Sequence, residues 1–338
     1  MLEFFMNYGL FLAKTLTLVF ALIMVLSILT ATAAKSKAKE GQLVITNINQ
    51  RLQHTEQQLK QETLPKDLYK QQRKNEQKAK KAQLKLAKTA KQPIPRLFVL
   101  RFDGDVRASQ VNALRETINA ILSVSMAHDE VLIVLESAGG FPTHYGLAAS
   151  QMKRLKDQGL TLTVAIDRVA ASGGYLMACV ADHIIAAPFA IVGSIGVVAQ
   201  IPNFHRLLNK NHIDFEQITA GEHKRTLTLF GKNSDKGRQK LQTEIEETHA
   251  LFKEFIGLHR PQINLEQVAT GEHWHAHHAL RLKLVDQLQT SDAYILAHYP
   301  AKNIYELNYT IKKSLTQRLS SSAATLVGWL KGQLSTLA

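Results

Sequence analysis

Three short apolar runs separated by helical patterns are the feature that most constrains the fold of this chain. The runs are residues 97–102 (LFVLRF), 131–137 (VLIVLES) and 160–167 (LTLTVAID), and each is typical of a buried strand. Helical patterns occupy residues 111–126 and 145–156 between them. This alternation predicts an α/β domain with a largely parallel sheet. Ligands in such folds gather at the carboxyl ends of the strands, so we look for functional residues directly after these runs.

The N-terminus carries a candidate membrane anchor. Residues 15–34 contain no charge over 20 positions, which is long enough to cross a bilayer as a helix. Ala31-Thr32-Ala33 has the small-x-small form of a signal-peptide cleavage site, but the apolar run is longer than a usual signal peptide's. We therefore expect a retained transmembrane anchor over residues 1–34. The basic residues that follow favour a cytoplasmic body, but long translocated domains escape that rule, so the side stays open.

The charge of the chain is concentrated in one segment. The formal net charge is +13, and residues 35–96 hold 16 Lys and Arg against 5 Asp and Glu. Only Tyr69 interrupts this segment as an aromatic residue, and no nucleic-acid motif occurs, so we expect no nucleic-acid partner. A basic segment just after a membrane helix would instead lie against anionic lipid headgroups. The single cysteine, Cys179, excludes a disulfide framework.

These features divide the chain into four parts. We expect an anchor over 1–34, a basic helical or flexible juxtamembrane segment over 35–95, the α/β domain over 96–288 and an amphipathic extension over 289–338. After residue 311, leucines spaced mostly by four predict an amphipathic helix or a pair of helices. This helical segment would pack on a partner subunit, on the membrane surface or on the rest of the chain. Residues 184–201 are also uncharged, but Pro188, Gly193 and Gly196 favour two buried strands with a turn over a second membrane span.

Two of the predicted strands are followed by small residues. Ala138-Gly139-Gly140 leaves backbone amides uncovered, which suits an oxyanion hole, although a tight turn has the same composition. Ser172, within AASGGY, opens the apolar helical run 175–180. A hydroxyl at a helix start with no bulk beside it suits a nucleophile, and an N-cap serine is the alternative.

A serine nucleophile needs a base, and spacing alone does not select one. The histidine candidates are His144, His183 and His205, of which His183 follows the serine by only 11 residues and would point away across a short helix. Lys224 can serve if burial lowers its pKa enough to leave a neutral amine. Another group, His273, His275, His277 and His278, lacks a carboxylate that completes a recognised metal motif, so we expect no metal site there.

Four motifs in order resemble a known family. Ser172 in AASGGY, Gly139-Gly140 after a strand, Ser194 in VGSIGV and Lys224 in AGEHKRTLTLFG are similar to the signal peptide peptidase A family of Ser–Lys peptidases, S49-type, and within it to SohB-type inner-membrane proteases. The resemblance covers roughly residues 96–290. It implies a ClpP/crotonase-like fold, Ser172 as nucleophile, Lys224 as general base and Ser194 as the residue that orients the lysine. It also implies an oxyanion hole at Gly139 and Gly140, with the amide of Ser172 as a further donor.

The function expected from this resemblance is that of a serine endopeptidase anchored in the bacterial inner membrane. It would hydrolyse peptides or membrane-associated protein segments through an acyl-enzyme, as in the hydrolysis of signal-peptide remnants or in quality control, without a cofactor. Relatives with one catalytic domain per chain resemble rings in which neighbouring subunits supply serine and lysine, so a homo-oligomer is expected. The alternatives are a crotonase-like acyl-CoA enzyme, which would not need the Ser172–Lys224 pair, and an inactive membrane scaffold.

Overall fold

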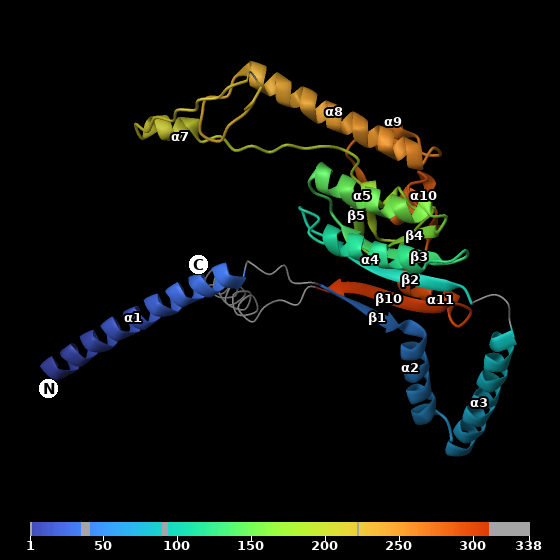
Figure 1. The fold of residues 1–338 in the computed structure, drawn as a ribbon. Coiled ribbons are helices and arrows are strands. Elements are labelled where there is room, and N and C mark those ends of the chain that lie inside the picture. Colours follow the sequence, from blue (N-terminus) through green and yellow to red (C-terminus); the bar gives the residue numbers. More distant parts are fainter. Residues whose placement is uncertain (1, 35–40, 90–93, 222, 311–338) are drawn as a thin grey trace. The chain divides into compact units, whose positions relative to one another are not determined.

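The computed structural model describes residues 2–34, 41–89, 94–221 and 223–310, without the side chains of 2, 5, 22–34, 77 and 79–89 (Figure 1). Its contacts divide the chain into two units, Met1–Leu43 with Tyr309–Ala338, and Val44–Asn308. The first unit contributes the helix α1 (Leu2–Ala34). The second unit holds the predicted functional residues and is described by itself below.

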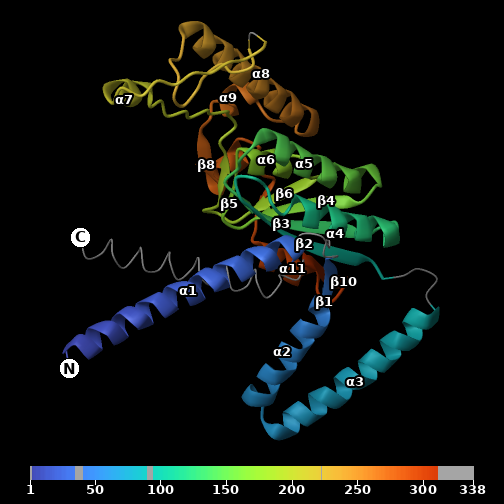
Figure 2. The same cartoon turned by 60° about the vertical axis from the view of Figure 1, so that its left-hand side comes forward.

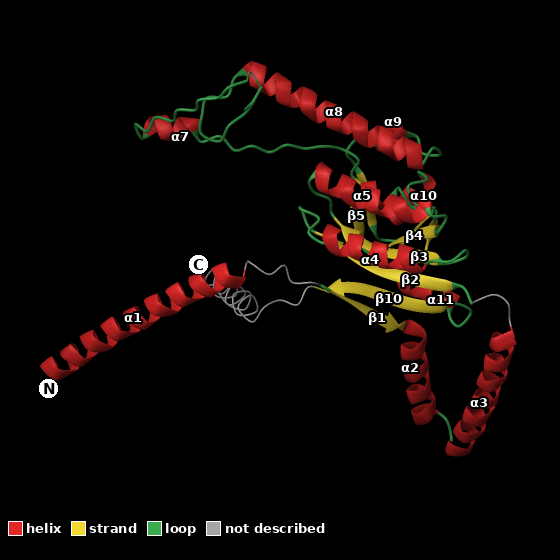
Figure 3. Ribbon diagram, viewed as in Figure 1, coloured by secondary structure: helices red, strands yellow, loops and turns green. Residues whose placement is uncertain are grey.

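The second unit contains both helices and strands, and its first and last strands extend past its boundaries (Figure 3). The helices are α2 (Ile48–Thr63), α3 (Lys66–Thr89), α4 (Val111–Val124), α5 (Pro142–Asp157), α6 (Gly173–Ala178), α7 (His205–Lys210), α8 (Asp235–His259), α9 (Leu265–Val268), α10 (Ala276–Arg281) and α11 (Ser291–His298). The strands are β1 (Gln42–Asn47), β2 (Arg96–Gly104), β3 (Glu130–Ser137), β4 (Thr161–Ile166), β5 (Val169–Ala171), β6 (His183–Ala186), β7 (Ile191–Gly193), β8 (His273–His275), β9 (Gln287–Leu288) and β10 (Asn303–Thr310).

The strands form a branched sheet. The main path runs β1-β10-β2-β3-β4-β6-β9, and a side branch leaves β3 through β5 and β7 to β8. Strands β10, β2, β3, β4, β6 and β9 pair in parallel, as do β3, β5 and β7, whereas β7 and β8 are antiparallel. The predicted α/β class with a largely parallel sheet is therefore confirmed. The branch matters for function because it carries the residues that follow β5 and β7.

Helices cover both faces of the main sheet. One face packs Leu97, Val99, Leu132 and Val134 against Ile48 of α2 and Ile295 of α11. Alternate side chains of a strand point to opposite faces, so Leu100 and Ile133 lie on the other face, where α4 and α5 pack. Strands buried on both faces read as continuous apolar runs, which is why β2 and β3 were recognisable in the sequence.

The folded body extends beyond the range 96–288. Strand β10 pairs with β2, matching Asn303 with Arg96 and Leu307 with Leu100. On the N-terminal side, Ile48 of α2 is 1% exposed and belongs to the core. These additions complete one face of the sheet, because without α2 and α11 the apolar side chains of β2 and β3 on that face would meet water.

Two further sequence predictions concern residues 184–201 and the residues after 311. Residues 184–201 hold the strands β6 and β7, joined by a turn, so the prediction of two buried strands is confirmed. The amphipathic helix predicted after residue 311 lies outside the described residues.

The anchor predicted over residues 1–34 contains α1, but the side chains of residues 22–34, most of its charge-free part, are outside the description. Across the residues that the structure does describe, we find no helix with both the length and the apolarity of a membrane span.

A long, mostly exposed segment connects β7 to α8. We call residues 197–234 the arm; Figures 1 and 2 show it running out to α7 and back to α8. Its aromatic rings contact one another, with Phe230 6.1 Å from Phe204 and 5.7 Å from Phe215 between centroids. Other apolar side chains remain exposed, including Val198 at 78% and Ile218 at 94%. The arm therefore presents apolar surface that the other described residues leave uncovered.

Candidate active site

Ser172 occupies a strained turn between β5 and α6. Its φ of 50° and ψ of −119° lie in a region that residues with a Cβ rarely adopt. The following Gly173 and Gly174 start the helix, and the side chain of Ser172 caps none of its amides. The N-cap alternative raised by the sequence is thus not the role of this hydroxyl. Strain of this kind, about 1–3 kcal/mol, persists where the surrounding structure holds it, and it is frequent at active sites.

The side branch of the sheet brings Ser194 beside Ser172. Strands β5 and β7 pair with Ala171 opposite Gly193, and the Ser172 amide donates to the Gly193 carbonyl oxygen at 2.8 Å. Ser194 also has a positive φ of 50°, and its amide donates to the carbonyl oxygen of Glu272 at 2.6 Å. Both serines are partly exposed. Within the described residues, neither hydroxyl has a hydrogen-bond partner.

The turn at Gly139 and Gly140 lies against Ser172. Gly139 has a φ of +95°, and a Cβ placed on it would come within 2.7 Å of the Ser172 Cβ. A Cβ on Gly140 would collide with the backbone of Val106, whose carbonyl oxygen accepts from the Phe141 amide at 2.9 Å. Both positions therefore require glycine, one for its φ and its contact with the serine and the other for a close backbone approach.

The backbone amides around Ser172 differ in their availability. The Ser172 amide is bonded to Gly193, and the Gly139 amide donates to the Ser137 hydroxyl at 3.0 Å. Two amides that the sequence resemblance nominated as oxyanion donors thus have internal acceptors. The amides of Gly140 and Gly173 have no acceptor within the described residues. Gly173 lies at the start of α6, where the helix dipole favours negative charge.

Lys224 is not brought to Ser172 within one chain. It lies on the arm and is exposed, in a shallow hollow that Phe215 and Ile218 also line. Across the described residues, no hydrogen bond or ion pair joins it to Ser172 or Ser194. The structure thus brings together Ser172, Ser194, Gly139 and Gly140, and leaves the predicted base apart.

The three histidines that the sequence offered as candidate bases also lie without contact to Ser172 among the described residues. His183 begins β6 opposite Thr163 in the parallel strand β4, and so lies at the amino edge of the sheet, whereas Ser172 follows the carboxyl end of β5. His144 is an exposed residue of α5 that contacts Phe141, and His205 begins α7 on the arm. None of the three has a contact with Ser172 in the part of the chain that is described.

Other polar clusters lie outside this site. Among the described residues, no group of three or more His, Cys, Asp or Glu side chains could hold a metal ion. In the histidine group, the Nδ1 of His275 lies 3.0 Å from the Phe189 carbonyl oxygen.

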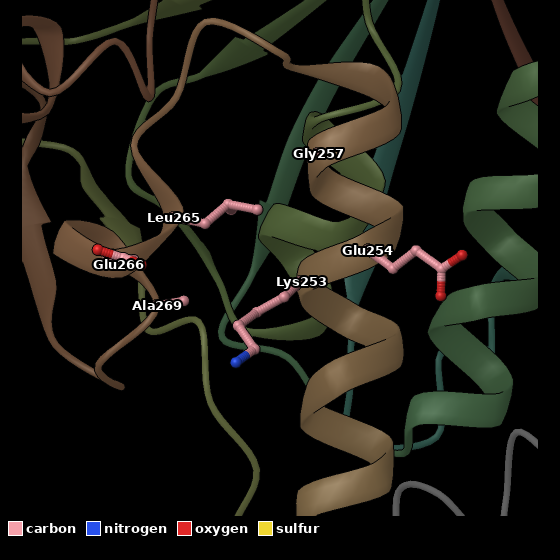
Figure 4. A pocket seen from close by; sticks show the side chains of 6 residues that line it. All are labelled: Lys253, Glu254, Gly257, Leu265, Glu266 and Ala269. Atoms are coloured by element: carbon pink, nitrogen blue, oxygen red, sulfur yellow. The ribbon is translucent and has the colours of Figure 1, made fainter.

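A separate hollow lies between α8 and α9 (Figure 4), where Leu265 points toward Gly257. None of the predicted site residues lines it.

Sequence reasoning missed two hydroxyl groups next to the site. Ser137 ends β3 and Tyr145 lies in α5; both are buried, and their hydroxyl oxygens are 2.5 Å apart. In the sequence, Tyr145 reads as an ordinary apolar-face residue of a helix. Nothing in the spacing of the two residues marks the contact, because it depends on how α5 packs across the sheet.

A strained serine at a helix start, between free backbone amides, is the arrangement of a serine hydrolase. The chain belongs to peptidase family S49: residues 3–152 match the peptidase family S49 N-terminal region, and residues 154–304 match peptidase family S49 itself. A protein of Haemophilus influenzae named "Probable protease SohB" is 45% identical over 94% of this chain and 92% of that protein. A "Probable protease SohB" of Buchnera aphidicola is 45% identical over 88% of this chain and all of that protein. The predicted family and the serine-peptidase class are confirmed.

Two solved protease structures align with this chain at low sequence identity. A membrane-bound stomatin-specific protease in complex with a substrate peptide aligns with a TM-score of 0.40 and 10% identity, covering 69% of this chain and 99% of that one. The ClpP protease catalytic domain of Plasmodium falciparum aligns with a TM-score of 0.38 and 9% identity, covering 57% of this chain and 85% of that one.

Proposed function

We propose that the chain is a membrane-anchored serine endopeptidase with a Ser172–Lys224 dyad on a ClpP/crotonase-like scaffold. The observation that carries the proposal is the geometry of Ser172, held at φ 50° next to a glycine turn and at the start of a helix. The Ser172 hydroxyl attacks a peptide carbonyl, Lys224 accepts its proton and returns it to the leaving amine, and water hydrolyses the acyl-enzyme.

The oxyanion forms between Gly140 and Gly173. Neither amide has an acceptor among the described residues, and the two lie on the two segments that meet at Ser172, whereas Gly139 contributes the turn that lets these segments approach. Each well-placed donor contributes about 3–4 kcal/mol of transition-state stabilisation. In this proposal Gly140 keeps its expected role and Gly173 replaces the amide of Ser172.

Lys224 comes from a neighbouring copy of the chain. A lysine acts as a base only when it is neutral, which requires a site screened from water, and Lys224 is exposed in its own chain. The exposed apolar side chains of the arm, including Val198 and Ile218, supply a surface on which a second copy can exclude water. Ser194, with a free hydroxyl beside Ser172, orients the incoming amine. The active species is then a homo-oligomer.

The substrates are peptides or membrane-associated protein segments with apolar side chains. Next to the glycine turn, Val106 is 61% exposed and Phe141 is 48% exposed. Both flank the backbone contact between Val106 and Phe141 that fixes the turn. Apolar side chains at this point favour substrates such as signal-peptide remnants or damaged membrane segments.

Anchoring in the bacterial inner membrane is by α1. Its described apolar side chains, among them Leu10, Phe11 and Phe20, are exposed, and the charge-free residues 15–34 continue the same helix. The basic helix α3 adds attraction to anionic lipid: Lys70 and Lys74 are exposed, and Glu76, one of its two acids, is bonded to Lys60.

Labelling with a serine-reactive fluorophosphonate tests the proposal together with peptide hydrolysis. The full chain in detergent should label and hydrolyse; Ser172→Ala should do neither, and Lys224→Ala should lose hydrolysis by at least about a hundredfold while remaining folded. His183→Ala is the matched control and should retain activity. Activity that survives in Lys224→Ala would remove the lysine from the dyad, and labelling that survives in Ser172→Ala would place the nucleophile elsewhere.

A further inference from the structure

Four groups form a continuous chain of hydrogen bonds behind the glycine turn. The Gly139 amide donates to the Ser137 Oγ at 3.0 Å, the Ser137 Oγ lies 2.5 Å from the Tyr145 Oη, and the Tyr145 Oη donates to the Asp105 carbonyl oxygen at 2.7 Å. Ser137 is 2% exposed and Tyr145 is fully buried. Water therefore cannot replace either hydroxyl without opening the core.

The bond to Asp105 sets the direction of the chain. Each hydroxyl has one proton to donate, and the Asp105 carbonyl oxygen only accepts, so the 2.7 Å bond uses the proton of Tyr145. The proton of Ser137 then has two acceptors, the Tyr145 Oη at 2.5 Å and the Gly104 carbonyl oxygen at 3.3 Å. The remaining lone pair of Ser137 accepts the Gly139 amide. Burial raises the pKa of Tyr145, so the phenol keeps the proton that this direction requires.

Tyr145 also touches the other side of the site. A Cβ on Gly173 would come within 2.5 Å of the Tyr145 Cγ, so the ring packs directly on the residue after Ser172. One side chain thus supports both the turn at Gly139-Gly140 and the start of α6. These are the two segments whose amides are proposed to hold the oxyanion.

We propose that Ser137 and Tyr145 are positioning residues. Their paired hydroxyl groups hold the Gly139 amide toward Ser137, and this orientation of the turn directs the next amide, that of Gly140, toward the oxyanion. The inference rests on the proposed peptidase function. Neither residue touches the substrate. Their effect is on the placement of a donor, and a shift of about 1 Å in a catalytic group is enough to cost up to about a hundredfold in rate.

The variant Tyr145→Phe tests the proposal, because it removes one oxygen and keeps the ring against Gly173. We expect kcat to fall about tenfold with KM within about twofold, since the donor acts only in the transition state. Ser137→Ala and the double variant should fall by a similar factor, because each breaks the same chain. Tyr294→Phe is the matched control: its hydroxyl also pairs with a hydroxyl, that of Thr163 at 3.2 Å, away from Ser172. It should leave both constants within about twofold.

Amide hydrogen exchange of the full-length protein gives a readout that does not depend on activity. Tyr145→Phe should speed exchange in peptides covering residues 137–141, and Tyr294→Phe should not. An unchanged kcat in Tyr145→Phe, or faster exchange spread evenly over the domain, would overturn the positioning role. If the wild-type chain hydrolyses no peptide, the proposed function fails on its own; unchanged exchange at 137–141 in Tyr145→Phe would then still overturn this inference.

Discussion

The amide of Ser172 donates a hydrogen bond to the carbonyl oxygen of Gly193 at 2.8 Å. This bond joins the end of β5 to the end of β7, and it places the proposed nucleophile beside the turn that carries Ser194. It also removes the Ser172 amide from the set of free donors. The bond therefore determines which amides can stabilise an oxyanion and which side chain can meet the incoming base.

Replacing Ser172 by glycine should stabilise the protein while abolishing hydrolysis. The φ of 50° and ψ of −119° cost about 1–3 kcal/mol for a residue with a Cβ, and glycine removes this strain. Glycine also loses about 0.5–1 kcal/mol more conformational entropy on folding, which offsets part of the gain. We expect a net gain of about 1 kcal/mol and a midpoint of thermal unfolding about 2–4 °C higher. Ser172→Ala retains the Cβ and should show no gain. Equal stabilisation by alanine and glycine would contradict the strain argument.

Gly139→Ala should inactivate the protein, and Gly159→Ala should not. Both glycines have a positive φ, +95° and +77°, so each substitution introduces backbone strain of about 1 kcal/mol. A Cβ on Gly159 meets nothing within 4 Å, whereas a Cβ on Gly139 meets Ser172 at 2.7 Å. The difference in kcat between the two variants, expected at about a hundredfold or more, reports the contact with the nucleophile. Comparable activities would show that the turn does not set the position of Ser172.

Stability should fall in acid through Asp129. Its carboxylate is buried and accepts bonds from Arg96 and from the Met126 amide at 2.7 Å. Burial works to raise the pKa of Asp129, but the Arg96 guanidinium and the Met126 amide outweigh it and hold the pKa below its ordinary value. A lowered folded pKa gives stability that is complete above the unfolded value of about 3.9 and is lost as pH falls through the folded pKa.

Urea unfolding between about pH 6 and pH 2 measures this dependence. Asp129→Asn should be less stable than wild type near neutrality and should lose less stability as the pH falls. Asp157→Asn, which removes an exposed pair with Lys153, should follow the wild-type curve within about 0.5 kcal/mol. Parallel curves for wild type and Asp129→Asn would assign the acid sensitivity to other groups.

Mixtures of two inactive chains should regain activity. If Ser172 and Lys224 come from neighbouring copies, some junctions between Ser172→Ala and Lys224→Ala chains pair an intact serine with an intact lysine. Differently tagged chains, co-expressed and purified through both tags, should then hydrolyse peptide at a fraction of the wild-type rate. A co-purified mixture that stays inactive would place the dyad within one chain.

The sequence alone determined the local structure and the chemical candidates. Strands buried on both faces require uninterrupted apolar runs, so β2, β3 and β4 were visible as such, and the small residues after β3 and β5 marked the turns at Gly139 and Ser172. Both patterns depend only on residues that are neighbours in the sequence, so they can be recognised without the structure. The sequence placed the end of the domain too early, because the apolar pattern of β10 is weak. This strand joins the sheet by pairing with β2, where Asn303 lies beside Arg96, a residue 207 positions earlier in the chain.

Only the tertiary structure decided which groups act together. The bond between Ser172 and Gly193, the hydroxyl pair of Ser137 and Tyr145, and the free amides of Gly140 and Gly173 all depend on how separate strands and α5 pack. Hydrogen bonds are short-range and directional, so a residue's type leaves open whether its donor faces an internal acceptor or a substrate. For the same reason the sequence could nominate Lys224, while the fold shows that its own chain leaves it exposed and apart from Ser172.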